Sequence, residues 1–493
     1  MYERSERVQF CRRDRRVTVR EHLERTFSAR EEVDLTEGGI VKPLLYLSLP
    51  LIITNVLQTA YNVADTFWLG RYGTTEVAAI SFAFPIIFLL ISFAIGFSVA
   101  GSVLVAQYVG ANRERDAEYA ASQTVSFSII GALVLGVFGY AVVDDVLALF
   151  AAEPEVTAAA ANYMRIYALG LVFVFGFLMF MSLMRGYGDT VTPMLIMFVS
   201  VAINVVLDPL LIFGVGPLPE LGIAGAAYAT IIARGLTLAV GLWLMLRGYR
   251  GVRIRLRELV PDPSYGLKLV RIGLPASFEG ASRALSMSLL LFVVALFTTP
   301  VVAAYGIGTR ILSVIVLPAM ALSQGVETMT GQNVGAGKPD RAAKANHLAA
   351  ATLFVFLTAA GVLSTLAAEP IVALFTNDPA VVDAGATFLD YVAPTFGLFG
   401  AMYIYIGGYR GAGMTGTAAG LVLLAFMGIQ IPVAWVAANA LGPTGVWLSF
   451  AAAHLVGAVG AALWFRRGTW RDGDLTADAA PSSAFESTAS TDD

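Results

Sequence analysis

The stretch "GAGMTGTAAGLVLLAFMGIQIPVAWVAANALGPTGVWLSFAAAHLVGAVGAALWF", residues 411–465, contains no Asp, Glu, Lys or Arg. It divides into two apolar segments at "ANALGPTG", residues 438–445, where Asn, Gly and Pro favour a turn. A helix of about 20 apolar residues is long enough to cross roughly 30 Å of hydrocarbon. The stretch therefore predicts two adjacent membrane-spanning helices.

The rest of the chain repeats this pattern. Further charge-free stretches lie at 77–112, 119–143, 190–207 and 311–326. The 493-residue chain is 57% hydrophobic and only 14% charged, with a mean hydropathy of +0.72, whereas soluble domains are about 25% charged. Twelve spans are predicted, and they start near residues 44, 77, 119, 158, 191, 222, 270, 302, 345, 384, 417 and 444. The sequence thus predicts an all-α polytopic membrane protein.

Lys and Arg predict how the spans are oriented, because cytoplasmic loops carry an excess of these residues. The loops after the even-numbered spans, together with the C-terminal flank, hold seventeen of them, and the loops after the odd-numbered spans hold only Arg71. We therefore expect a multi-pass protein of the plasma membrane with both termini in the cytoplasm.

The two ends of the chain differ in composition from the spans. Residues 1–39 carry charges of both signs and lack the apolar core of a cleaved leader, which predicts a cytoplasmic arm. Residues 468–493 predict a disordered acidic cytoplasmic tail. Cys11 is the only cysteine, so an internal disulfide is excluded.

An internal repeat divides the spans into two sets of six. "AQYVGANRERDAEYA" at 106 recurs as "GQNVGAGKPDRAAKA" at 331, and "MRGYGDT" at 184 recurs as "YRGAGMT" at 409. The numbering offset between the copies is the same for both pairs, and it shortens after the fifth span, where "LGIAG" at 221 matches "LGPTG" at 441. An even number of spans per copy gives a parallel repeat, with a substrate path commonly between the copies.

The repeat sets the predicted domain boundaries. We expect an N-terminal six-helix lobe at 40–247, a cytoplasmic linker at 248–269 and a C-terminal six-helix lobe at 270–467. A duplicated bundle with no transport role is the alternative interpretation of the repeat.

One copy of the repeat carries a polar cluster that the other lacks. Asp65 in the first span and Asp208 in the fifth are expected at similar depth, in the outer half of the membrane. Tyr61 lies four residues before Asp65 and Asn204 four before Asp208, so each pair shares a helix face. Thr230 of the sixth span is expected in the same layer.

Two carboxylates in a poorly hydrated place favour one of two chemical solutions. One carboxyl group can take up a proton, because burial and a neighbouring like charge both disfavour ionisation. Alternatively the group can bind Na⁺ with amide, hydroxyl and carbonyl oxygens, which hard cations prefer. Both solutions make the cluster a cation switch. The alternative is a static ion pair with Arg234, one turn beyond Thr230.

The second copy has a different set of charges. Glu279 and Arg283 share one face of the seventh span, and Arg310 lies in the eighth span, with Glu327 near its inner end. Glu279, Arg283 and Arg310 form a candidate second polar site, although a Glu–Arg pair at this spacing is more often structural.

Four motifs resemble a known family. "LPLIITNVLQTAYNVADTFWLGRYGTTEVAAISFAFP" at 49–85, "YVGANRERDAE" at 108–118, "MRGYGDTVTPM" at 184–194 and "NVVLDP" at 204–209 are similar to the multidrug and toxic compound extrusion (MATE) family. The prokaryotic and archaeal branch with an acidic cluster in its first lobe is the most similar. The resemblance covers residues 40–467.

The resemblance implies a twelve-helix secondary antiporter that exports cationic or amphipathic organic compounds against H⁺ or Na⁺. Asp65 and Asp208 match the coupling carboxylates of that branch. Asn204 and Tyr61 match its amide and tyrosine, and Thr230 matches its hydroxyl. Another branch places a coupling glutamate in the span of Glu279, but no partner acid is found in the tenth span here.

The resemblance further implies a monomer in membrane lipid, with no enzymatic activity, no nucleic-acid partner and no cofactor or metal beyond Na⁺ as a coupling ion. A lipid-linked oligosaccharide flippase of the same superfamily is an alternative, because Arg283 and Arg310 lie near mid-membrane. A channel or a non-transporting membrane sensor is a second alternative. ATP-driven export is not favoured, because Pro339 replaces the hydroxyl residue of a P-loop in "GQNVGAGKPD".

Overall fold

The computed structural model describes residues 34–148, 153–249 and 251–476. Within these ranges the secondary structure is helical, with no strand. Asp34 and all later described residues form one unit by their contacts. The predicted arm, as far as residue 33, and the predicted tail beyond residue 476 lie outside the described residues.

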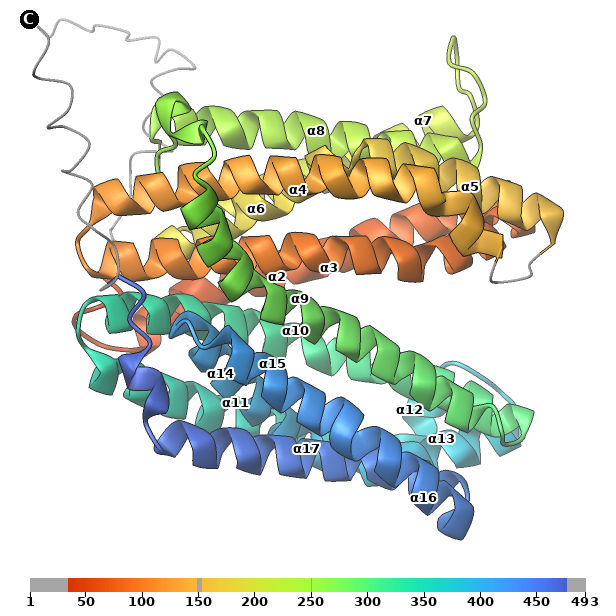
Figure 1. Ribbon diagram of the computed structural model, residues 1–493. Helices are drawn as coiled ribbons and strands as arrows, with labels where there is room; N and C mark the ends of the chain where they lie inside the picture. Colours follow the sequence, from red (N-terminus) through yellow and green to blue (C-terminus); the bar gives the residue numbers. More distant parts are fainter. Residues whose placement is uncertain (1–33, 149–152, 250, 477–493) are drawn as a thin grey trace, which may run out of the picture. The chain divides into compact units, whose positions relative to one another are not determined.

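Seven helices form the first half of this unit (Figure 1). They are α2 (Val41–Tyr72), α3 (Thr74–Gly110), α4 (Glu114–Ala148), α5 (Pro154–Leu169), α6 (Leu171–Tyr187), α7 (Val191–Ile212) and α8 (Ile223–Arg247). Helices α5 and α6 meet at Gly170 and are bent by 56°, so together they make one broken span. Helix α6 ends at Gly188, whose φ of 106° lies in the left-handed region that glycine adopts without strain.

A short turn, η1 (Leu256–Leu259), lies in the linker, and the second half then repeats the order of the first. Its elements are α9 (Pro263–Val294), α10 (Thr299–Gly335), α11 (Pro339–Leu366), α12 (Ala368–Ala373), α13 (Pro379–Val392), η2 (Ala393–Thr395), α14 (Phe396–Gly411), α15 (Thr415–Leu423), η3 (Leu424–Gln430), α16 (Ile431–Leu441), α17 (Pro443–Arg466) and η4 (Thr469–Asp472). Segment η3 is π-helical, so its backbone hydrogen bonds skip one residue more than in the flanking α-helices.

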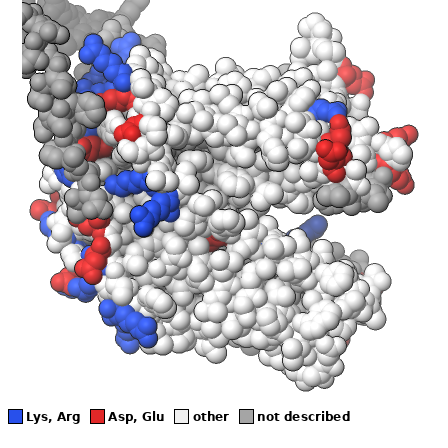
Figure 2. Space-filling model, viewed as in Figure 1, with Lys and Arg blue, Asp and Glu red and all other residues white. Residues whose placement is uncertain are grey.

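Ten described helices are long and apolar enough to cross a membrane, when α15, η3 and α16 are counted as one continuous helix (Thr415–Leu441). The bent pair α5–α6 is an eleventh candidate. The pair α13 and α14 occupies the place of the remaining predicted span. Large apolar side chains cover the outer faces of these helices, for example Val137 and Phe138 on α4, which are 71% and 60% exposed. On the face shown in Figure 2, charged side chains gather at the two ends of the helices and the band between them is almost free of charge. The prediction of an all-α polytopic membrane protein is confirmed.

The two halves pack against each other reciprocally. Helix α3 of the first half packs on α9 of the second, and α10 of the second half packs on α2 of the first. Because α3 and α10 are equivalent in the repeat, as are α2 and α9, the two contacts are copies of one another. Figure 2 shows the surface hollowed between the halves at the end opposite the main cluster of Lys and Arg.

At the Lys- and Arg-rich end the halves are held by matching glutamine bonds. The Gln107 side-chain amide donates to the carbonyl oxygen of Gly411 (3.1 Å), and that of Gln332 donates to the carbonyl oxygen of Gly186 (3.2 Å). The donors of these two bonds are equivalent in the repeat, and so are the acceptors. A Cβ on Gly110 would lie 1.9 Å from the Gln332 carbonyl oxygen, so the backbones of α3 and α10 touch here.

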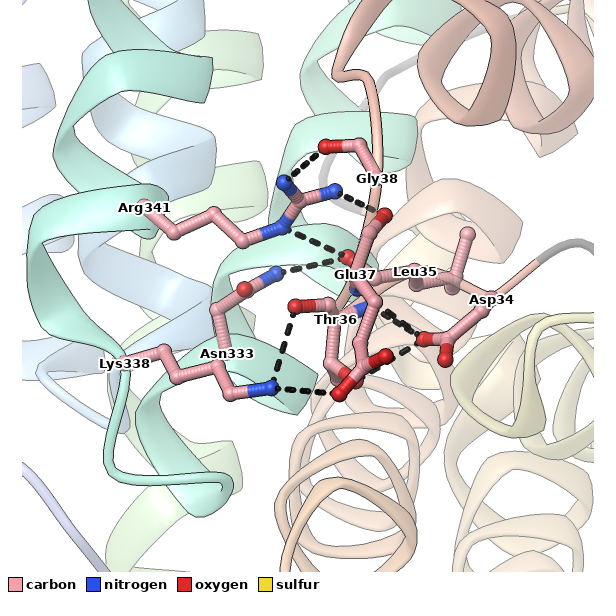
Figure 3. A network of polar contacts seen from close by, with 8 residues as sticks. All are labelled: Asp34, Leu35, Thr36, Glu37, Gly38, Asn333, Lys338 and Arg341. Atoms are coloured by element: carbon pink, nitrogen blue, oxygen red, sulfur yellow. Dashed lines mark hydrogen bonds and ion pairs between the residues drawn. The ribbon is translucent and has the colours of Figure 1, made fainter.

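The segment before α2 is bonded to the opposite half (Figure 3). The Arg341 guanidinium donates to the carbonyl oxygens of Glu37 (2.8 Å) and Gly38 (2.6 Å). The Leu35 carbonyl oxygen accepts from the Asn333 amide at 3.0 Å. Residues 34–39, predicted as part of a cytoplasmic arm, therefore join the first half to the adjoining ends of α10 and α11.

The segment after α17 is bonded to the first half. The Leu475 N–H donates to the Gln107 side-chain oxygen at 2.7 Å, and Lys268 donates to the Leu475 carbonyl oxygen at 2.8 Å. Trp470 is 1% exposed and stacks on Phe465 with ring centres 4.5 Å apart. The expectation of disorder from residue 468 onward is therefore wrong for residues 468–476, because one buried tryptophan anchors them.

Helix α9 also begins earlier than predicted. It starts at Pro263, inside the stretch expected to be a linker, because the Asp262 carboxylate accepts from the N–H groups of Ser264 (2.9 Å) and Tyr265 (3.4 Å). An Asp at this position satisfies backbone donors that the first helical turn leaves free.

Candidate functional site

The structure brings the five predicted coupling residues into one buried layer of the first half. Tyr61 and Asp65 lie on α2, Asn204 and Asp208 on α7, and Thr230 on α8, and α7 packs against both α2 and α8. Asn204 and Asp208 are fully buried, and Asp65 is 9% exposed. The side chain of Asp65 lies beside those of Asp208 and Asn204.

Each of the five residues has a buried oxygen with no hydrogen-bond partner in the described protein. These oxygens are the Tyr61 hydroxyl, Asp65 Oδ1, Asn204 Oδ1, Asp208 Oδ2 and Thr230 Oγ1. The Asn204 amide donates to Asp208 Oδ1 at 3.1 Å, which orients both side chains but leaves the second oxygen of each free. A buried polar atom without a partner costs about 1–3 kcal/mol. The layer is therefore suited to take up a proton or a cation that these oxygens can share.

Arg234 does not form the static ion pair that was the alternative to a switch. Within the described ranges, no carboxylate oxygen lies within 4.0 Å of its guanidinium nitrogens. The guanidinium donates to the Gln58 side-chain oxygen at 2.8 Å and lies over the rings of Tyr61 (4.6 Å) and Phe177 (4.2 Å). The positive charge is thus held beside the two carboxylates without neutralising either one directly.

A cavity of about 560 Å³ lies next to this layer. Asp65, Tyr61 and Thr230 line it, whereas the fully buried Asp208 and Asn204 lie behind them. Most of the other lining residues are aromatic or aliphatic, with Phe84, Phe88, Tyr163, Tyr167 and Phe177 among them, and Gln58 and Arg234 also line the cavity. The volume is within the roughly 300–1,000 Å³ of drug-sized sites.

The candidate second site is not assembled as one cluster. Glu279 lies 3.8 Å from Arg410 of α14, measured between side-chain oxygen and nitrogen, rather than pairing with Arg283 on its own helix. Arg283 lies 5.4 Å from the ring centre of Tyr403. Arg310 is exposed and forms no ion pair within the described part of the chain.

Sequence reasoning missed a buried ionic group between the halves. Glu327 lies 3.8 Å from Arg185 of the first half and 3.7 Å from Arg410 of the second. The signal was present in the repeat, because "MRGYGDT" and "YRGAGMT" place these two arginines at the same position of each copy. What the sequence could not show is that both arginines converge on a single glutamate, whose own repeat equivalent is Ser102.

Comparison with known proteins agrees with this architecture. The profile of the MatE family matches residues 50–210 and 275–436, so the two matches begin at equivalent positions of the two copies of the repeat. The probable multidrug resistance protein YoeA of Bacillus subtilis is 31% identical over 419 residues, which is 83% of this chain and 89% of that protein. The FAD transporter of Shewanella oneidensis is 29% identical over 75% of this chain and 82% of its own length.

Solved structures show the same fold. The outward-facing structure of a multidrug resistance MATE transporter superimposes with a TM-score of 0.82 at 25% identity, covering 89% of this chain and 98% of that one. The resemblance to the family, which the four motifs of the first half indicate, is therefore confirmed across both halves. The chain belongs to the MatE family of multidrug and toxic compound extrusion transporters, which are multi-pass membrane proteins and not enzymes.

Proposed function

We propose that this chain exports organic cations and amphipathic compounds across the plasma membrane in exchange for H⁺ or Na⁺. One observation carries the proposal. Two carboxylates that form no ion pair with an arginine in the described ranges lie beside a drug-sized cavity, with Asp65 lining it and Asp208 buried behind. The five oxygens without partners would serve as ligands or proton acceptors for the coupling ion.

The proposed orientation places both termini, and the linker between the two halves, in the cytoplasm. The excess of Lys and Arg at one end of the helices supports it. At this end the halves are joined by Gln107 and Gln332, and at the opposite end the surface between them is hollowed (Figure 2). The described conformation would then be outward-facing, as is the similar MATE structure.

The coupling step follows from the order of the two carboxylates. A proton or Na⁺ arriving from outside meets Asp65 first and reaches Asp208 through it. Its uptake removes the repulsion between the two negative charges and also the attraction for a cationic substrate in the cavity. The substrate is then released outward, and the ion leaves on the cytoplasmic side after the halves rock. Ion and substrate need only differ in their affinity for the two conformations.

Arg234 has a supporting part in this proposal. Gln58 and two aromatic rings hold its guanidinium. Its positive charge therefore lowers the free-energy cost of burying two carboxylates nearby, although Arg234 forms no permanent ion pair with either of them. The acids therefore keep their capacity to exchange one cation for another. We propose no cofactor beyond the coupling ion, no nucleic-acid partner, and a monomer surrounded by lipid.

The cavity of the first half favours drug export over the flippase alternative. Its lining places Asp65 and Arg234 among aromatic rings and so has no excess of positive charge, whereas a carrier of anionic lipid-linked headgroups needs a cationic cavity. A channel or a non-transporting sensor has no need of two protonatable groups on one side. Uphill export driven by an ion gradient separates an antiporter from both of these classes.

The experiment is export of a fluorescent organic cation from vesicles that contain the purified protein. A proton gradient and a Na⁺ gradient are imposed separately, for the wild type, Asp208→Asn and the control Asp383→Asn, whose carboxylate is exposed on α13. We expect one gradient to drive export by the wild type and the control but not by Asp208→Asn. Normal export by Asp208→Asn would contradict the assignment, and no export by the wild type would favour the flippase.

A further inference from the structure

A second cavity in the other half occupies the position that the repeat relates to the first. Fourteen residues line it, and twelve of them are repeat equivalents of residues that line the first cavity. These pairs include Arg283 with Gln58 and Leu290 with Asp65. With the shorter offset that applies to the last span, His454 is equivalent to Arg234. The two cavities are copies of one site that have diverged.

The divergence has left Arg283 as the only Asp, Glu, Lys or Arg that lines the second cavity, whereas Asp65 and Arg234 both line the first. The carboxylate of the first cavity, Asp65, is replaced by Leu290, and none of the fourteen lining residues is acidic. The neutral Gln58 is replaced by the positively charged Arg283, whereas Arg234 is replaced by His454. His454 and Gln430 are the other large polar side chains of the lining.

The positive charge of Arg283 has no counter-ion in the described part of the chain. Its guanidinium rests against the face of Tyr403, with 5.4 Å between the guanidinium carbon and the ring centre. Glu279 lies one turn earlier on α9, but its carboxylate oxygen is 3.8 Å from a guanidinium nitrogen of Arg410. Arg410 also forms an ion pair with Glu327. An uncompensated arginine inside a spanning helix is costly and is typical of a functional site. An anion in the cavity would supply the missing charge.

The walls of this cavity are aromatic and locally irregular. Tyr305, Phe399, Phe426 and Phe450 line it. Phe426 lies in the π-helical segment η3, and its carbonyl oxygen accepts a hydrogen bond from Ser286 at 3.1 Å. Helix α7, which holds the equivalent position in the first half, has no such segment. Single π-helical turns within α-helices occur frequently at binding sites.

The size of the cavity limits what it can hold. Its volume is about 100 Å³, against about 560 Å³ for the first cavity. An apolar protein cavity of about 150 Å³ accommodates benzene. The second cavity therefore fits a carboxylate or sulfonate together with the edge of one ring, and not a complete drug.

We propose that this cavity is an anion subsite, in which Arg283 binds the carboxylate or sulfonate of a substrate whose ring lies among Tyr305, Phe399 and Phe450. The two halves would then recognise opposite charges, so that aromatic anions and zwitterions join the cations as substrates. The inference extends the proposed function but needs no gradient and no coupling ion, because it concerns binding alone.

The test is equilibrium binding of benzenesulfonate to the purified full-length protein in detergent, with phenyltrimethylammonium as a cationic probe of similar size. Arg283→Gln introduces the residue that the first half already has at this position, so the fold should tolerate it. We expect this variant to weaken benzenesulfonate binding by at least about tenfold, because one charge-assisted contact is lost. Arg283→Lys should give an intermediate loss, since the charge stays but the bidentate geometry does not.

The control removes the same charge elsewhere on α9. Arg271→Gln lies at an exposed position that does not line the cavity, and it should bind benzenesulfonate as the wild type does. Leu290→Asp, which restores the acid of the first half, should abolish benzenesulfonate binding. Equal binding by the wild type and Arg283→Gln, an equal loss in Arg271→Gln, or no binding by the wild type would overturn the proposal. Asp208→Asn should leave this binding unchanged, so its outcome is independent of the proposed coupling site.

Discussion

The matched glutamine bonds between the halves make a quantitative prediction about the closed end of the transporter. The Gln332 amide donates to the carbonyl oxygens of Gly186 (3.2 Å) and Tyr187 (3.1 Å), and the side chain is 5% exposed. Leucine has a similar volume but cannot donate. Gln332→Leu therefore removes two hydrogen bonds that join the halves and does not create a large void.

The expected magnitude follows from those two bonds. Each buried neutral hydrogen bond contributes about 1 kcal/mol net. The conformation in which this end is closed should therefore lose about 2 kcal/mol of stability relative to the conformation in which it is open. This shifts the ratio of open to closed molecules roughly 30-fold. Gln107→Leu should act in the same direction, because its amide donates to the carbonyl oxygens of Gly411 (3.1 Å) and Gly473 (3.2 Å).

A single reporter cysteine measures this shift. Thr328→Cys in a Cys11→Ser background places the thiol where Thr328 is 1% exposed and faces the carbonyl oxygen of Arg185 across the interface. A water-soluble maleimide added from the proposed cytoplasmic side should label it roughly 30-fold faster in Gln332→Leu, when labelling is slower than closing.

The matched control is another buried glutamine. The Gln123 amide donates to the carbonyl oxygens of Glu258 (2.7 Å) and Val260 (2.9 Å), which belong to the linker and not to the opposite half. Gln123→Leu should lower thermal stability without changing the labelling rate. Unchanged labelling in both interface variants, or an equal increase in Gln123→Leu, would refute the reasoning.

Two further predictions concern the ends of the lobes. Trp470→Ala should destabilise the protein by about 3–5 kcal/mol, because the buried ring stacks on Phe465 and its indole N–H donates to the Phe465 carbonyl oxygen at 2.9 Å. A thermal unfolding scan should show a much smaller loss of stability for the control Trp464→Ala, because Trp464 is 44% exposed. Hydrogen bonds from Ser264 hold the pKa of Asp262 below its ordinary value, against a smaller opposing effect of burial, so its capping contribution is present above the ordinary value and is lost as pH falls through the lowered pKa. The difference in melting temperature between the wild type and Asp262→Ala should therefore shrink as the pH is lowered from 6 to 3, and a constant difference would contradict this cause.

The fold could be predicted from the sequence because membrane spans impose a simple rule. Runs without charge, such as residues 411–465, are long enough to cross the bilayer, and the internal repeat fixes how the spans are grouped. Where the prediction was wrong, one side chain outweighed the local composition. Trp470 is buried although it lies in the segment predicted to be a disordered acidic tail. Asp262 caps α9 and so begins this helix inside the polar stretch predicted to be a linker.

The candidate site was predictable in part for the same reason. Spacing along one helix placed Tyr61 with Asp65 and Asn204 with Asp208, because residues four apart share a helix face. Which helices face each other is decided by packing, and the convergence of Arg185 and Arg410 on Glu327 depends on that. Which charged side chains line each of the two cavities likewise depends on packing, so the sequence alone could not place Arg283 without an acid in the second cavity.

The central claim is that Asp65 and Asp208 exchange a small cation for a cationic substrate. It is tested most directly by adding tetraphenylphosphonium to the purified protein in weakly buffered detergent solution and measuring the protons released, with a parallel arm that measures displaced radioactive Na⁺. The account predicts that the wild type releases one of these ions on binding, and that Asp65→Asn and Asp208→Asn release neither. Binding without release of either ion by the wild type, or unchanged release by Asp208→Asn, would contradict the account.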